Sequence, residues 1–86
     1  MTAHESVDGP ADDTLDRVLS VFRDVLSVGD LTPRSDFFDL GGNSLLAVEV
    51  AVQLSEQVGL EVPVADVFVA PTPIELAEAI KARSGG

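Results

Sequence analysis

The chain has 86 residues, of which 15 are acidic and 5 basic, so its formal net charge at pH 7 is −10. This length suits one small domain with a single core, and a deep enclosed active site is not expected. The negative charge argues against binding to nucleic acid or to anionic membranes, and it favours protein partners with basic docking surfaces. Alternatively, the acidity merely keeps the protein in solution.

Several kinds of site are excluded by composition. The sequence has no Cys, so it has no disulfide, no thiolate zinc site and no thiol nucleophile, and no metal site is expected. The apolar run at residues 45–48 is far too short to span a bilayer. Because no signal-peptide pattern precedes it, we expect a cytoplasmic protein that does not act at a membrane.

The N-terminal part of the chain predicts a tail followed by a helix. Residues 1–11 are polar, contain a Gly-Pro pair and lack a helical period, so we expect a flexible tail. Asp12 or Asp13 can cap the first helix, and Gly29 suits its end. The apolar residues of this helix recur every three or four positions: Leu15, Val18, Leu19, Phe22, Val25 and Leu26.

A long connection follows at residues 29–43. Loops of this length in compact domains are usually functional or anchored to the core. We expect a short helical turn near residues 35–38, followed by two glycines that allow unusual backbone angles. Four apolar side chains are candidate anchors: Leu31, Phe37, Phe38 and Leu40.

The second half of the chain predicts further helices. One is expected at residues 44–58, with Gly59 as its end. Residues 64–69 fit either a short helix or a strand. Thr72 and Glu75 flank Pro73 in a capping box that predicts a last helix. The fold class is therefore all-α, a small bundle of three main helices and a short fourth one.

The helix at residues 44–58 has more apolar surface than one core face needs. Leu45, Val48 and Val52 form a separate cluster beside Ser44 when successive residues are placed about 100° apart. Either residues 64–69 cover this cluster or a partner protein does. For Leu45 and Val48 we favour a partner. The core face itself consists of Leu46, Ala47, Val50, Ala51, Leu54 and Val58.

Ser44 stands at the expected start of this helix, directly after two glycines. Unpaired backbone N–H groups and the helix dipole favour an anion at such a position, so a phosphodiester on the hydroxyl would suit it. Taken alone, the position favours a plain N-cap, a role for which Ser is well suited. A hydrolase nucleophile would need a base, and the single His is His4 in the expected tail. We therefore expect no catalytic residue.

Residues 36–46, Asp-Phe-Phe-Asp-Leu-Gly-Gly-Asn-Ser-Leu-Leu, closely resemble the attachment motif of peptidyl carrier proteins, the thiolation domains of nonribosomal peptide synthesis. The likeness continues through residues 63–68 and 70–73, and we expect the carrier domain at 12–83 and a flexible end at 84–86. The resemblance implies an acyl-carrier-protein-like four-helix bundle. It also implies that Ser44 receives 4′-phosphopantetheine from coenzyme A, whose thiol then carries an aminoacyl or acyl group as a thioester.

The resemblance further implies that the protein is not an enzyme but a substrate of a phosphopantetheinyl transferase. Adenylation, condensation and tailoring enzymes of natural-product (antibiotic) biosynthesis are the other expected partners of a monomeric, freestanding carrier. The implied partner interface comprises Asn43, Leu45, Val48 and Val67. An acyl carrier protein of polyketide or fatty-acid synthesis and an unmodified helical interaction module are the alternatives, and Asn43 before the serine favours the peptidyl branch.

Overall fold

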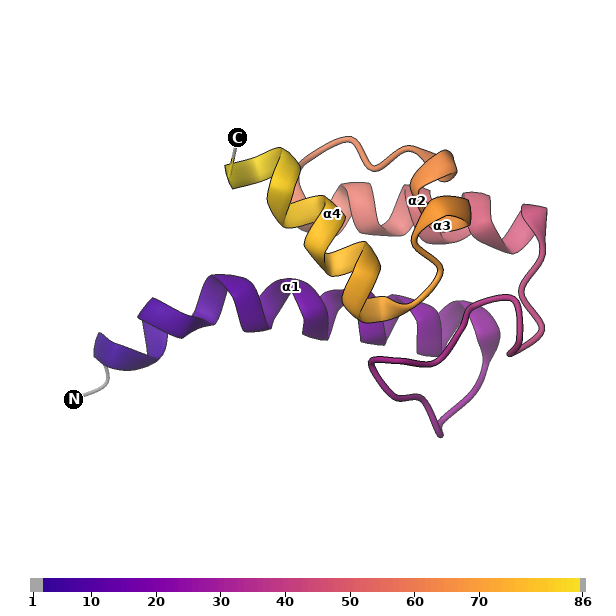
Figure 1. Cartoon of the computed structure of the whole chain (residues 1–86), viewed down its shortest axis with the longest axis horizontal. Helices are drawn as coiled ribbons and strands as arrows, with labels where there is room; N and C mark the ends of the chain where they lie inside the picture. Colours follow the sequence, from indigo (N-terminus) through magenta and orange to yellow (C-terminus); the bar gives the residue numbers. More distant parts are fainter. Residues whose placement is uncertain (1–2, 86) are drawn as a thin grey trace.

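A computed structural model describes residues 3–85, and it describes the side chains of residues 14–83. Within this part the chain forms four helices and no strand: α1 (Ala3–Leu26), α2 (Ser44–Val58), α3 (Val64–Val69) and α4 (Pro73–Gly85). Figure 1 shows α1 and α2 running in opposite directions, with α4 crossing obliquely. α1 contacts both α2 and α4, while α3 bridges α2 and α4. The expected all-α four-helix bundle is confirmed, and residues 64–69 are helical.

The start of α1 differs from the prediction. The helix begins at Ala3, and not at Asp12 or Asp13. Its first turns project beyond the other helices (Figure 1). A helical segment that faces no neighbour needs no apolar stripe, so the pattern that indicates a helix starts only at Leu15. The flexibility expected for residues 1–11 and 84–86 lies partly outside the described residues and stays a prediction.

The end of α1 also falls earlier than Gly29. Leu26 is its last residue, and Ser27 adopts a left-handed backbone conformation with a φ of 58°. The Val28 N–H donates a hydrogen bond of 3.3 Å to the Arg23 carbonyl. This bond satisfies a carbonyl that the helix end leaves without a partner. Ser27 thus occupies the left-handed position that usually follows a helix and that glycine usually fills.

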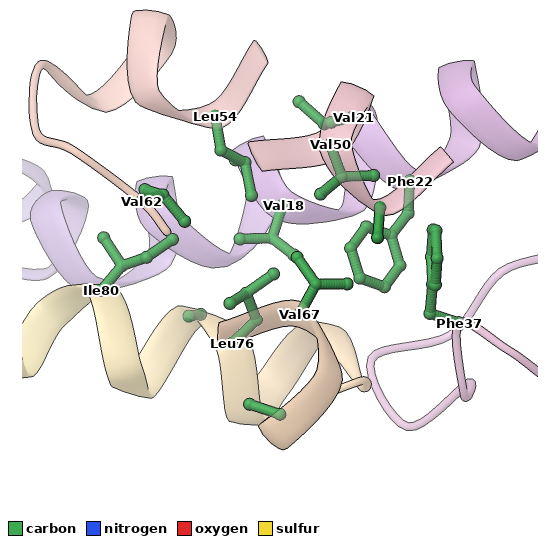
Figure 2. Packing of buried hydrophobic residues seen from close by; sticks show 13 residues of the cluster. Val18, Val21, Phe22, Phe37, Val50, Leu54, Val62, Val67, Leu76 and Ile80 are labelled. Atoms are coloured by element: carbon green, nitrogen blue, oxygen red, sulfur yellow. The ribbon is translucent and has the colours of Figure 1, made fainter. Parts of the chain in front are cut away.

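The core lies where all four helices and the long loop meet (Figure 2). Val21 is fully buried although it lies outside the predicted stripe of α1, whereas Leu19 is only half-buried. On α2 the residues that are buried all come from the predicted core face. The largest fully buried apolar side chains are Val18, Val21, Phe22, Phe37, Val50, Leu54, Val67, Leu76 and Ile80.

Two backbone hydrogen bonds anchor the loop to the other end of the chain. The Phe37 N–H donates to the Pro71 carbonyl over 2.9 Å, and the Ile74 N–H donates to the Pro33 carbonyl over 3.0 Å. The second bond also satisfies one of the open N–H groups in the first turn of α4. The long loop is therefore held in place, as its length predicted.

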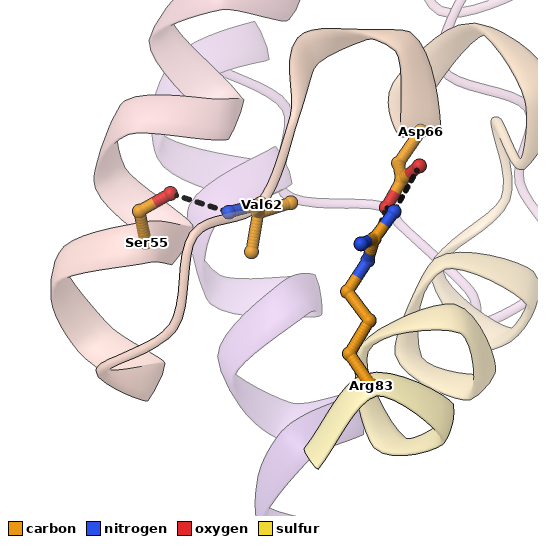
Figure 3. Close-up of polar contacts among 4 residues, drawn as sticks. All are labelled: Ser55, Val62, Asp66 and Arg83. Carbon is orange, nitrogen blue, oxygen red and sulfur yellow. Dashed lines mark hydrogen bonds and ion pairs between the residues drawn. The ribbon is translucent and has the colours of Figure 1, made fainter. Parts of the chain in front are cut away.

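Polar contacts hold α3 and α4 in position. Thr72 caps α4 as predicted, since its hydroxyl accepts from the Glu75 N–H over 3.3 Å. The Glu75 carboxylate accepts from the Thr72 hydroxyl over 3.0 Å, and not from the Thr72 N–H as in a full capping box. Arg83 of α4 donates two hydrogen bonds, of 3.1 and 3.0 Å, to the Asp66 carboxylate of α3 (Figure 3). This bidentate pair connects α3 to α4.

Leu54→Ala should lower the free energy of unfolding by about 2–5 kcal/mol, because it leaves a cavity at a site with no exposed surface. Leu45→Ala is the matched control on the same helix, since Leu45 is 71% exposed and its loss should change stability by less than about 0.5 kcal/mol. Urea denaturation measures both. Equal effects of the two substitutions would contradict the packing described above.

Candidate functional site

Asn43 caps α2. Its backbone is extended, with φ −148° and ψ −177°, and its side-chain oxygen accepts a hydrogen bond of 3.0 Å from the Leu46 N–H. Its own carbonyl accepts the first intrahelical bond, from the Ala47 N–H, over 2.8 Å. The position of Ser44 in the sequence favours that residue as the cap. The structure assigns the role to Asn43 instead, so Ser44 becomes the first residue of the helix.

The Ser44 side chain is consequently exposed and takes no part in capping the helix. Its hydroxyl forms no hydrogen bond with any residue of the described part of the chain. A hydroxyl engaged in capping would have to break that bond before it could be modified, and here no such cost arises. The adjacent backbone N–H groups of the first helical turn favour a negatively charged substituent at this place.

The loop in front of Ser44 is shaped by Phe37 and Gly42. The Phe37 ring is fully buried, and its carbonyl accepts from the Gly42 N–H over 3.0 Å. A Cβ atom at Gly42 would overlap the Phe37 ring and lie 2.7 Å from the Phe37 carbonyl oxygen. Gly41 has a φ of 101°, which favours glycine there as well. Both glycines are therefore needed for the chain to turn into α2 beside a buried ring.

All four phenylalanines of the chain belong to one aromatic row. Phe22 of α1 contacts Phe37, Phe37 contacts Phe38, and Phe38 stacks on Phe68 of α3, with ring centroids 5.2, 5.1 and 5.4 Å apart. The sequence indicated Phe37 and Phe38 as anchors of the loop. It carried no signal that Phe68 joins them, because that contact depends on where α3 packs. The row ties the loop before Ser44 to both α1 and α3.

The second apolar cluster of α2 is exposed. Leu45 is 71%, Val48 45% and Val52 52% exposed, so about half or more of each side chain is left open to solvent. Phe68 and Val69 of α3 are exposed as well, Val69 to 82%. Exposed apolar side chains therefore occur both at the start of α2, next to Ser44 along the chain, and on α3.

Val67 does not belong to this surface. The resemblance implied that it contacts partners, but it is completely buried within the core (Figure 2). On a helix as short as α3, the residue that faces the core is flanked by residues that face away from it. Phe68 and Val69 follow it in the chain, and they replace Val67 as the exposed residues of α3. Asn43, Leu45 and Val48 are exposed as expected.

Two other kinds of site are not found in the described residues. The described residues contain no group of three or more His, Cys, Asp or Glu side chains that could hold a metal ion. Among residues 3–85, none of the helices has both the length and the apolar character that a membrane crossing requires.

The geometry at Ser44 agrees with a comparison of the sequence with known families. Residues 16–80 match the family described as "Phosphopantetheine attachment site". The chain belongs to this family. Its cofactor is 4′-phosphopantetheine, and its members generally carry bound groups without catalysing reactions themselves. Carrier domains of nonribosomal peptide synthetases work in general with adenylation, condensation and phosphopantetheinyl transferase partners.

The curated relatives are much longer proteins. The chain is 41% identical over 73 residues to a linear gramicidin synthase from Brevibacillus parabrevis, covering 85% of this chain and 1% of that protein. It is 44% identical over 71 residues to isonitrile lipopeptide synthase of Streptomyces coeruleorubidus, covering 81% and 5%. The chain thus spans a small fraction of each relative and corresponds to a carrier domain of the nonribosomal peptide synthetase type.

Solved structures share the fold. BlmI, a type-II acyl carrier protein from Streptomyces verticillus involved in bleomycin biosynthesis, superimposes with a TM-score of 0.82 at 19% identity, covering 96% of this chain and 98% of BlmI. Holo T3CT superimposes with a TM-score of 0.68 at 28% identity, covering 76% and 94%. These likenesses confirm the acyl-carrier-protein-like bundle.

Asn43→Ala should lower the free energy of unfolding by about 1 kcal/mol, because the Leu46 N–H loses its capping acceptor. Asn43→Asp keeps an acceptor oxygen at the same place and should stay close to the wild type. Urea denaturation of the three proteins checks this. A loss in the Asp variant as large as in the Ala variant would argue against the cap.

Proposed function

We propose that Ser44 is the residue that receives 4′-phosphopantetheine, and that the protein presents an aminoacyl group bound to this arm as a thioester. The observation that carries the proposal is the free, exposed Ser44 hydroxyl at the first position of α2, with the capping role taken by Asn43. Since the chain has no Cys, the thiol that holds the cargo is supplied by the arm.

The surroundings of Ser44 support attachment there. In the transfer from coenzyme A, a bond forms between the Ser44 Oγ and phosphorus, a pyrophosphate P–O bond breaks, and the hydroxyl proton is released with the adenosine bisphosphate. The chain's part is to expose the oxygen and to accept negative charge beside it, which the first turn of α2 favours.

The partners belong to the same proposal. A phosphopantetheinyl transferase would modify Ser44, an adenylation enzyme would load the arm, and condensation or tailoring enzymes would use the cargo. We assign their docking to the exposed residues near Ser44 and on α3: Asn43, Leu45, Val48, Phe68 and Val69. A monomeric and freestanding state, a cytoplasmic location and the domain boundaries 12–83 remain predictions.

Ser44→Ala should abolish modification. When the wild-type protein is incubated with coenzyme A and a broad-specificity phosphopantetheinyl transferase, its intact mass should rise by one phosphopantetheinyl group, whereas the mass of the variant should not change. Ser20→Ala is the matched control, because Ser20 is also an exposed serine, and it should be modified like the wild type. A mass gain that survives Ser44→Ala would overturn the assignment.

Leu45→Asp should slow modification and loading without unfolding the protein, because it places a charge on an exposed apolar side chain next to Ser44. Ser20→Asp adds the same charge at an exposed site on α1 and should leave both rates unchanged. The measurements are transferase and adenylation kinetics, together with circular dichroism of each variant. Unchanged kinetics in Leu45→Asp would remove Leu45 from the docking surface.

A further inference from the structure

One ion pair joins α3 to the last turn of α4. Arg83 donates two hydrogen bonds to the Asp66 carboxylate, from Nε over 3.1 Å and from Nη2 over 3.0 Å (Figure 3). The Arg83 side chain is 46% exposed and the Asp66 side chain 17%. Ion pairs that water reaches stabilise a fold little, whereas two parallel bonds fix the relative orientation of the groups that they join. The pair therefore influences geometry more than stability.

Local structure alone does not orient α3. The helix has six residues, and its N-cap, Pro63, makes no side-chain hydrogen bond to the first turn. The connection in front of the helix is fastened to α2, because the Ser55 hydroxyl accepts from the Val62 N–H over 2.9 Å (Figure 3). This bond fixes where α3 begins. The rotation of α3 about its own axis is left to the side chains of the helix.

Three successive side chains of α3 set this rotation. With about 100° between neighbours, Asp66, Val67 and Phe68 point in three different directions around the helix. Asp66 is bound to α4, Val67 is fully buried, and Phe68 stacks on a phenylalanine of the long loop. Val69 takes the remaining direction and is 82% exposed. Because so little of Val69 touches the protein, the other three side chains determine where it points.

The chain offers few substitutes for Arg83 as the partner of Asp66. Residues 35–80, which include the loop before Ser44, α2 and α3, contain eight carboxylates and neither Lys nor Arg. Asp66 therefore takes its cation from α4, 17 residues further along the chain. Lys81 lies about 160° from Arg83 around α4, so it occupies another side of that helix.

We propose that Arg83 is a positioning residue for partner docking. By holding Asp66 it fixes the rotation of α3 and so directs Val69 toward the partner that also contacts Leu45, next to Ser44. The inference rests on the proposed docking surface, and it adds a residue that lies outside that surface. A side chain in the last turn of α4 thus controls how well an enzyme binds the carrier without touching that enzyme.

The test uses a broad-specificity phosphopantetheinyl transferase as the partner, with coenzyme A and the unmodified protein. Arg83→Gln should raise the KM for the carrier roughly threefold at unchanged kcat, because docking weakens while Ser44 and its cap stay in place. Its midpoint of urea denaturation should stay close to that of the wild type. Arg23→Gln removes the same charge from an exposed residue of α1 and should leave the KM unchanged.

A double-mutant cycle tests whether Arg83 acts through Asp66. Asp66→Asn should raise the KM about as much as Arg83→Gln, and the double variant should be no worse than either single one. In ¹⁵N-resolved amide spectra of the unbound protein, Arg83→Gln should shift the signals of Val67 and Val69 and leave that of Leu46 in place. Effects that multiply to roughly ninefold in the double variant would indicate two independent contacts and would overturn the inference.

Val69→Ser separates this inference from the proposed function. If the wild-type protein is not modified at all, the proposed function fails, and this inference fails with it. If Val69→Ser leaves the KM unchanged, α3 is not part of the docking surface, and the inference falls together with that assignment. If Val69→Ser raises the KM but Arg83→Gln does not, the inference alone is overturned.

Discussion

The burial of Phe37 is the constraint on which the site depends. Its ring fills the space between α1 and the loop, and this leaves no room for a side chain at Gly42. The chain passes the ring at Gly42 and reaches Asn43, whose backbone is extended. In this conformation Asn43 caps α2. Ser44 then follows as a helical residue with an uncommitted hydroxyl. A packing contact in the core thus determines which residue of the motif is available for modification.

The same packing holds α3, which is too short to be stable alone. Three tertiary contacts fix it: the burial of Val67, the stacking of Phe68 on Phe38, and the two hydrogen bonds between Asp66 and Arg83. They hold the exposed side of α3 at a defined place relative to the start of α2. The exposed apolar residues that we assign to docking are therefore positioned by the whole bundle.

The sequence predicted features that depend on local patterns. Apart from the start of α1, the helix plan, the core face of α2 and the N-cap at Thr72 follow from apolar period and cap chemistry, and the motif around Ser44 indicated the family. The choice of Asn43 over Ser44 as the cap was not predictable, because both residues cap well and the loop decides between them. The burial of Val67 was missed because a six-residue helix has too short a pattern to show which side faces the core.

The most direct test of the central claim is to locate the modification within the chain. Cleavage after Arg34 and Lys81 releases a peptide that contains Ser35, Ser44 and Ser55. Fragmentation of this peptide from the phosphopantetheinylated protein should place the added mass on Ser44 alone. Added mass on Ser35 or Ser55, or a modified protein whose peptide carries none, would contradict the account.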